Sequence, residues 1–581
     1  MDNDGRPQDL NSAALLRARA HPALTGLSGA GVVVCVIDYG FDLLHPALRT
    51  TSGETRFAAL IDQNGSRLVR SEINRLIRAC ERDGDRSALD DIYDPHANYF
   101  GRDGVQVGAH GSWVASIAAG SRTAEFCGVA PGATLIGLQL NLPDRAWREE
   151  DTDGRPAWID AAAQRDETLS SWRGWRSYEE SSAIVHALEA SYELARALRP
   201  DGIVINLSIG AWAGGHDGNS PVNQAIDAIT ANGKRPGEPT AVVVTGTGNA
   251  GADRGHVSGA LTGDTPFGFH WSFDTKNTNQ SKLEVWADCE DNIAVDIRSP
   301  FDCGGVSFTL DGSARGTSAI MTHDGQLIGV AENRGAVRGS LRAVRVLLHP
   351  GLVSPSLLSS DRSVFDVSVR PERADDGGVV HAWIERDCAM TPPTQIYTGR
   401  CQTASTPSET GRTTPRPLGQ TSLTSIACAA SVIAVAGLNN AAADDAVLEM
   451  SGRGPRPWTA SGDTPSPLLA APANDLFGAR SKTNGYMRGS GTSGAAAIVS
   501  GAAALALQAA DIAGRKLDHD LLAAALLGRA GAWTKNADWR ADRGFGAMRF
   551  DASAILSGTL TNAPANTLTS TPFIAGIPSR L

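Results

Sequence analysis

Residues 31–38 read GVVVCVID, a short β-branched run that is apolar on both faces and ends in a carboxylate. Similar apolar runs lie at residues 133–140, 201–209, 240–245 and 431–438. Strands that are buried on both faces are typical of parallel sheets. Helix-like segments occur between these runs, at residues 111–120, 181–198, 222–231 and 493–510. The alternation predicts an α/β fold with a doubly wound, mainly parallel sheet.

The pattern changes between residues 259 and 421. Short alternating segments such as KLEVWADC and VVHAWIERD are separated there by Gly, Asp, Asn and Pro, which is typical of antiparallel sheets. We therefore expect a β-rich module inserted into the α/β domain. The expected organisation is an N-terminal extension (1–24), the α/β domain in two parts (25–258 and 422–555), the module (259–421) and a C-terminal tail (556–581).

Two shorter insertions, at about 49–106 and 143–177, are expected to interrupt the first half of the chain. The second one is rich in tryptophan, with Trp147, Trp158, Trp172 and Trp175. These rings either pack the insertion onto the domain or supply a binding subsite.

Composition bears on partners and location. The chain has 581 residues, with Lys+Arg 52 against Asp+Glu 63 and a net charge of −11, which disfavours nucleic acid as a partner. The sequence contains no run of about 18 apolar residues, which a membrane-spanning helix would need, and no apolar leader followed by a small-residue cleavage site. We therefore expect a cytoplasmic protein that does not bind membranes.

The eight cysteines are scattered without a CxxC pair or zinc-like spacing, so we expect buried, reduced thiols and no metal site. Two pairs could still form disulfides under oxidising conditions, namely Cys289 with Cys303 and Cys388 with Cys401.

Three loops carry residues suited to catalysis. Asp38 ends an apolar run, where functional groups of α/β sheets gather, although such an Asp is also an ordinary turn or cap residue. His110 heads a small-residue helix, and a histidine pKa of about 6.5 suits proton transfer, although a surface cap is the simpler alternative. Ser493 opens a long helix after a glycine-rich turn, where a nucleophile or a plain N-cap serine would both fit.

Together these loops follow the order Asp, His, Ser that subtilisin shows. The segments VIDYGFDLLHPAL (36–48), HGSWVASIAAG (110–120) and GTSGAAAIVSGAAAL (491–505) resemble the aspartate, histidine and serine motifs of the subtilisin-like serine proteases, the subtilase family. INLSIG (205–210), VVVTGTGN (242–249) and SGRGP (451–455) resemble further segments of that family. The β-rich insertion is similar to the jelly roll of the branch that includes the spore-germination proteases.

The resemblance implies a serine endopeptidase with Asp38, His110 and Ser493 as catalytic residues. It implies an oxyanion hole formed by the Asn249 amide and the Ser493 N–H. An enzyme of this kind needs no cofactor. A polypeptide substrate would lie along Ser208, Ile209 and Gly210. Thr247 and Gly248 would form an uncharged wall of the primary pocket, which predicts apolar or small side chains before the cleaved bond.

Some positions depart from the family pattern. Trp113 stands where the family often has a second histidine, Ser112 where it has threonine, and Gly494 where it commonly has methionine. Ala47 replaces an acidic residue that binds calcium in many members, so no calcium is expected there. Because no catalytic atom is lost, an active protease is favoured over the alternative, a pseudoprotease or scaffold that binds peptides or partners through the groove and the insertion. The oligomeric state is not indicated.

Overall fold

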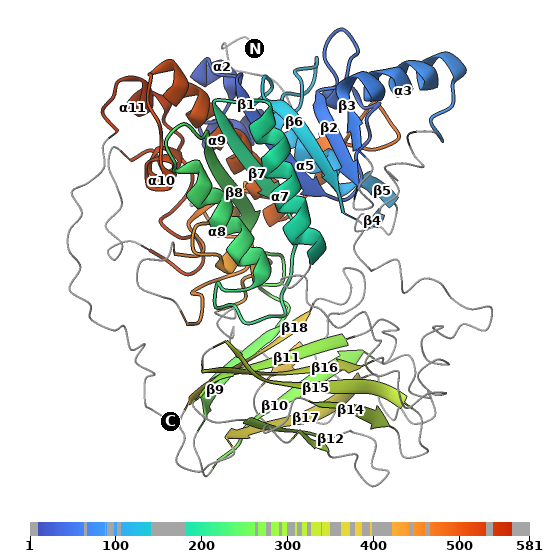
Figure 1. Cartoon of the computed structure of the whole chain (residues 1–581), viewed down its shortest axis with the longest axis vertical. Helices are drawn as coiled ribbons and strands as arrows, with labels where there is room; N and C mark the ends of the chain where they lie inside the picture. The colour runs from blue at the N-terminus through green and yellow to red at the C-terminus, as the bar shows by residue number, and fades with distance from the viewer. Residues whose placement is uncertain are drawn as a thin grey trace, which may run out of the picture.

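The computed structural model of the chain is shown in Figure 1. It describes residues 10–62, 67–87, 89, 98–100, 106–140, 182–261, 265–274, 281–289, 293–298, 308–310, 316–321, 327–338, 340–348, 362–371, 378–385, 395–397, 421–440, 445–458, 465–529 and 539–560. Trp147, Trp158, Trp172, Trp175, Cys303, Cys388, Cys401 and the tail beyond residue 560 lie outside these ranges.

A mixed sheet of eight strands organises the described part of the α/β domain. Its order is β21 (Leu469–Pro472), β20 (Ile433–Leu438), β8 (Thr240–Gly246), β7 (Gly202–Leu207), β1 (Val32–Asp38), β6 (Thr134–Gln139), β2 (Phe57–Asp62) and β3 (Arg67–Val69). All neighbouring pairs are parallel except β2 with β3. The predicted α/β class is confirmed.

Helices cover both faces of this sheet (Figure 1). Alternate residues of β1 point to opposite sides, so that Val34 and Val36 join one core while Cys35 and Ile37 join the other. The first core contains α5 (His110–Ala119), α9 (Thr492–Ile512) and α10 (His519–Leu526), and the second contains α7 (Ser182–Ala197) and α8 (Pro221–Gly233). Burial on both faces explains why these strands read as continuous apolar runs.

Three strands of this sheet were not predicted from the sequence, the three-residue edge strand β3 and the longer strands β2 and β21. β2 lies inside the range 49–106, which was expected to be an insertion, yet it pairs in parallel with β6. β21 forms the opposite edge. β2 and β21 each contain two alanines, a residue that is depleted in strands, and β21 ends in proline, which is tolerated at edges. Helix α3 (Arg70–Asp83) follows β3 and packs on the edge of the sheet formed by β2 and β3.

The inserted module consists of two antiparallel sheets packed on a shared core. One sheet has the order β13 (Phe308–Leu310), β12 (Ile293–Arg298), β17 (Arg362–Pro371), β10 (Phe267–Asp274) and β19 (Gln395–Tyr397). The other has the order β14 (Gly316–Met321), β15 (Leu327–Arg338), β16 (Leu341–Leu348), β11 (Ser281–Asp288), β18 (Gly378–Glu385) and β9 (His256–Leu261). This arrangement fits a jelly-roll insertion, and in Figure 1 β18 lies on the side of the module nearest the α/β domain.

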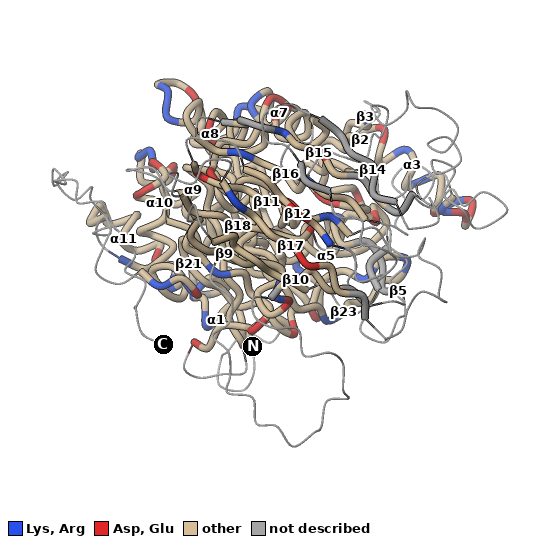
Figure 2. Tube along the Cα trace, turned by 90° about the horizontal axis from the view of Figure 1, so that it is seen from below, with Lys and Arg blue, Asp and Glu red and all other residues tan. Residues whose placement is uncertain are grey.

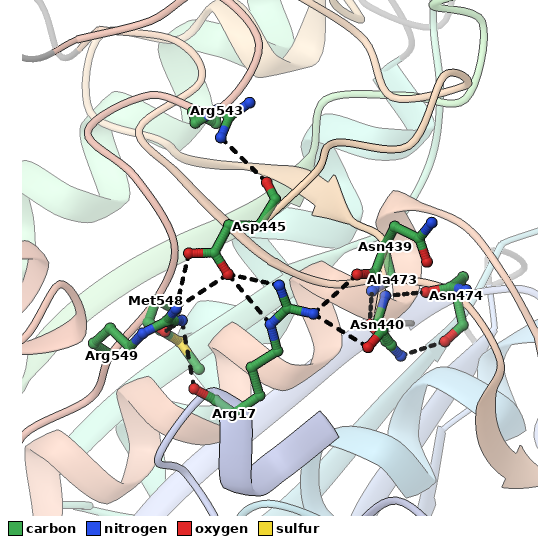
Figure 3. A network of polar contacts seen from close by, with 9 residues as sticks. All are labelled: Arg17, Asn439, Asn440, Asp445, Ala473, Asn474, Arg543, Met548 and Arg549. Atoms are coloured by element: carbon green, nitrogen blue, oxygen red, sulfur yellow. Dashed lines mark hydrogen bonds and ion pairs between the residues drawn. The ribbon is translucent and has the colours of Figure 1, made fainter. Parts of the chain in front are cut away.

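The N-terminal segment is anchored to the α/β domain by an ionic network (Figure 3). Helix α1 (Ser12–Arg17) ends at Arg17, whose guanidinium donates to Asp445 Oδ1 at 2.7 and 3.2 Å. Arg549 donates to both oxygens of the same carboxylate, at 2.8 and 3.0 Å. Asn11 adds a reciprocal pair of bonds to the backbone of Phe477 in the hairpin of β22 (Leu476–Ala479) and β23 (Tyr486–Gly489).

The described part of the chain contains charged residues of both signs and one strongly apolar helix. Figure 2 shows acidic and basic positions interspersed over the described part of the chain. Among the described helices, α9 alone has the length and hydropathy of a membrane span, but 83% of that window is buried inside the protein. Such burial is what the core helix of a folded domain shows.

Candidate active site

Asp38 and His110 meet where β1 ends and α5 begins. The Gly111 N–H donates to Tyr39 O at 2.7 Å, and a Cβ at position 111 would lie 2.7 Å from Gly40 O. The helix can therefore start against the end of β1 because residue 111 is glycine. His110 Nδ1 lies 2.6 Å from Asp38 Oδ1.

The Asp38 carboxylate is fully buried, whereas the His110 side chain keeps 15% of its surface exposed. Asp38 Oδ1 accepts a second hydrogen bond, from the Tyr39 N–H at 2.7 Å. A buried carboxylate held in this way fixes the imidazole with its Nδ1 toward the protein, because Nδ1–H donates to the carboxylate. The other ring nitrogen, Nε2, is then the one suited to act as a base.

Ser493 is the second residue of α9. This helix packs against α5 and against β7, β8 and β20. Thr492 and Ser493 bond to Gly248 and Ser208, which follow the parallel strands β8 and β7, so the helix N-terminus lies at the same end of the sheet as Asp38. The Ser493 hydroxyl donates to the backbone oxygen of Ser208 at 3.5 Å, which is a long hydrogen bond. The positive end of the helix dipole favours negative charge beside this hydroxyl.

Asn249 is held against the same turn. Its Oδ1 accepts from the Thr492 N–H at 2.9 Å and from Thr492 Oγ1 at 3.1 Å. Because a backbone N–H can only donate, these bonds turn the amide Nδ2 away from Thr492. A Cβ at Gly491 would lie 3.0 Å from Nδ2, so the glycine leaves room for the amide.

The expected substrate-binding segments flank this turn. Ser208 Oγ donates to Asn206 Oδ1 at 2.7 Å, and Asn206 Nδ2 donates to Ser500 Oγ at 3.0 Å, which fixes the 208–210 segment to α9. The Gly248 N–H donates to Thr492 Oγ1 at 3.1 Å. Ile209 is buried. Thr247 is fully buried as well, and its N–H donates to Val435 O at 3.0 Å while its carbonyl accepts from the Thr424 N–H at 3.0 Å, so Thr247 does not face the site as the sequence predicted.

Two residues at this place were not singled out from the sequence. Trp212 lies two residues after Gly210, and Glu385 from β18 accepts the N–H groups of Trp212 and Ala213 at 2.9 and 3.2 Å. Burial raises the pKa of the Glu385 carboxyl. The alternation of VVHAWIERD indicates that Trp383 and Glu385 share a face of one strand, but not what that face contacts.

Among the described residues, no group of three or more His, Cys, Asp or Glu side chains is placed to hold a metal ion. Cys35, Cys80, Cys127, Cys289 and Cys428 are all buried.

Comparisons with known proteins agree with the motifs. The model of the subtilase family matches residues 29–297 and 403–547 of the chain. Among solved structures, the CspB protease of Clostridium perfringens matches with a TM-score of 0.64 and 18% sequence identity, over 94% of this chain and 98% of that chain. At this identity the likeness concerns the fold. No curated protein sequence matches significantly.

Proposed function

The chain belongs to the subtilase family of serine proteases, and from this premise we propose that it is an endopeptidase acting through Asp38, His110 and Ser493. The observation that carries the proposal is the 2.6 Å contact between Asp38 and His110 at the end of the sheet to which α9 also brings Ser493. The substrate is a polypeptide, and no cofactor takes part.

The reaction begins when His110 Nε2 removes the proton from the Ser493 hydroxyl. The long bond to Ser208 O opens as the hydroxyl turns toward the imidazole. Ser493 Oγ then attacks the substrate carbonyl carbon, and the buried Asp38 carboxylate stabilises the imidazolium that forms. His110 next protonates the leaving amine as the C–N bond breaks. Water, activated by the same imidazole, hydrolyses the acyl-enzyme.

The oxyanion of the tetrahedral intermediate is bound by Asn249 Nδ2 and the Ser493 N–H. The two bonds from Thr492 to Asn249 Oδ1 hold the amide in this orientation before the substrate arrives. Donors that are fixed in advance stabilise the developing charge without reorganising, and removal of the equivalent amide in subtilisin costs about 10²–10³ in kcat.

The proposal is tested by covalent labelling and proteolysis. A fluorophosphonate should modify Ser493, as located by mass spectrometry, and Ser493→Ala should lose both labelling and casein hydrolysis. Loss of the nucleophile lowers kcat by about 10⁶ in subtilisin.

Ser490→Ala is the matched control, because Ser490 lies in the same turn but its hydroxyl only accepts from the Asp475 N–H. This variant should keep labelling and hydrolysis. Casein hydrolysis by Ser493→Ala at the parental rate would refute the assignment. A parent that binds peptides but neither labels nor cleaves would instead be a pseudoprotease.

A further inference from the structure

The indole of Trp212 lies between the two segments that flank Ser493. It folds back over Gly210, where an added Cβ would lie 2.3 Å from its Cη2 atom. Its other edge reaches Gly248, where an added Cβ would lie 3.0 Å from Nε1 and 3.1 Å from Cζ2. Glycine at position 210 therefore leaves the space that the ring occupies, whereas a side chain at position 248 would meet Thr424 Cγ2 first, at 2.6 Å, and would only crowd the indole.

These two segments both bond to the start of α9, which carries the proposed nucleophile. The first contributes Ser208 O, which accepts the Ser493 hydroxyl bond, and the second contributes Gly248 and Asn249, which bond to Thr492. By the resemblance to the subtilases, the side chain that precedes the cleaved bond is expected next to these segments, beside Gly248. The Trp212 indole already takes up part of that space.

The inserted module holds residues 208–216, here called the tryptophan loop, in position. The two carboxylate oxygens of Glu385 accept the successive N–H groups of Trp212 and Ala213, an arrangement that is charge-assisted when Glu385 is ionised. Two residues earlier on β18, Trp383 stacks on His216 with ring centroids 4.0 Å apart. The α/β domain adds the Ser425 N–H and hydroxyl, which both donate to Ala211 O, at 2.6 and 3.1 Å.

We propose that Trp212 is a specificity residue that restricts the position before the cleaved bond to Gly, Ala or Ser, and that Glu385 of the inserted module keeps its indole there. This inference rests on the proposed function and sharpens it. The sequence indicated apolar or small side chains at this position, and the placement of the indole selects the small ones. The module thereby contributes to substrate choice without supplying a catalytic group.

The parent enzyme provides the first test. Denatured casein is digested, and the residue before each cleaved bond is identified by mass spectrometry. We expect Gly, Ala and Ser at most sites. Two internally quenched peptides with one of these sequences, differing only in Ala or Phe before the cleaved bond, then give the ratio of kcat/KM. Since even one methylene changes kcat/KM by about 10- to 200-fold, the Ala peptide should be preferred by at least about 100-fold.

Variants locate the cause of this preference. Trp212→Ala should raise the Phe:Ala ratio of kcat/KM by at least about 100-fold, and Trp212→Leu should raise it less. Glu385→Gln leaves one acceptor oxygen for two N–H groups and should raise the ratio about tenfold by loosening the loop. Glu284→Gln is the matched control, because Glu284 lies buried on the neighbouring strand β11 but bonds to Arg345 and Trp286 instead. Its ratio should equal that of the parent.

The outcomes separate the two proposals. If Ser493 labels but the parent cleaves after Phe or Leu as readily as after Ala, the specificity inference is wrong and the proposed function stands. An unchanged ratio in Trp212→Ala and Trp212→Leu overturns the role of the indole. A ratio that changes equally in Glu385→Gln and Glu284→Gln overturns the role of Glu385. If Ser493 fails to label, the proposed function itself fails.

Discussion

Replacing Gly494 by alanine should impair catalysis much more than it impairs folding. A Cβ at this position would lie 2.7 Å from Trp113 Cη2 and 2.6 Å from Leu476 Cδ1. Carbon atoms in contact are normally about 3.5–4.0 Å apart, so each overlap is about 1 Å. Both neighbours are buried, and the displaced residue would be the one directly after Ser493.

The Trp113 ring cannot move aside as Leu476 can. A Cβ at Gly478 would lie 2.3 Å from Trp113 Cδ1, and one at Gly489 would lie 2.7 Å from Cζ2, so backbone borders the ring on these sides too. Overpacking costs about 1–3 kcal/mol. Replacing Gly by Ala within a helix stabilises the helix by about 1 kcal/mol. The net loss of stability should therefore be about 0–2 kcal/mol.

The catalytic cost should be larger, because a shift of about 1 Å at a reacting group lowers the rate by about 10²-fold. We therefore expect Gly494→Ala to lose about 100-fold in kcat on a quenched peptide while its unfolding midpoint changes by only a few degrees. The double variant Gly494→Ala/Trp113→Phe has a smaller ring and should recover at least tenfold of this loss. The interaction energy from such a cycle should be about 1–3 kcal/mol. Parental kcat in Gly494→Ala, or strictly additive effects in the double variant, would refute the reasoning.

Two further predictions concern stability. Asp445 has a φ of +56°, which Asn tolerates, so Asp445→Asn removes the charge between Arg17 and Arg549 without backbone strain. The backbone amides of residues 12–17 should then exchange with solvent about 5- to 30-fold faster. Unchanged exchange in this variant would contradict the anchoring role of Asp445. Burial lowers the pKa of His381 to about 3, against about 6.5 in an unfolded chain. The unfolded state therefore binds the proton first, and stability that is complete above pH 6.5 is lost as the pH falls toward 3. Melting temperatures measured between pH 7 and 4 should fall less for His381→Phe than for the parent, and equal slopes would disprove the assignment.

Sequence patterns predicted the framework of the α/β domain because its strands are buried on both faces. The run at residues 31–38 and the four runs like it all became neighbouring strands. β2 and β21 went unrecognised because their alanines carry little strand signal, although the sheet buries them as well. The antiparallel module was recognised from its alternation, which fits a sheet with one face on the shared core.

The motifs likewise placed Asp38 beside His110, and the structure joins these two residues. What could not be predicted is the compensation between Trp113 and Gly494. In the sequence these appear as two unrelated departures from the family pattern, 381 positions apart (494 − 113 = 381). In the structure the missing side chain at 494 leaves the space that the indole fills. This compensation depends on how the volumes of two distant side chains fit together in space, which a sequence motif does not specify.

The tryptophan loop shows why the inserted module belongs to any account of the site. The segment from Ser208 to His216 is held at one end by α9, through Asn206 and Ser500, and farther along by β18, through Glu385. Glu385 lies 173 residues from Trp212 in the chain, so no local pattern joins them. The first attachment holds the backbone beside Ser493 and the second holds the backbone of Trp212. Under the proposed role of Trp212, a shift of the module would alter which side chains fit without moving Asp38, His110 or Ser493. Substrate choice and catalytic rate are therefore expected to respond to different substitutions in this chain.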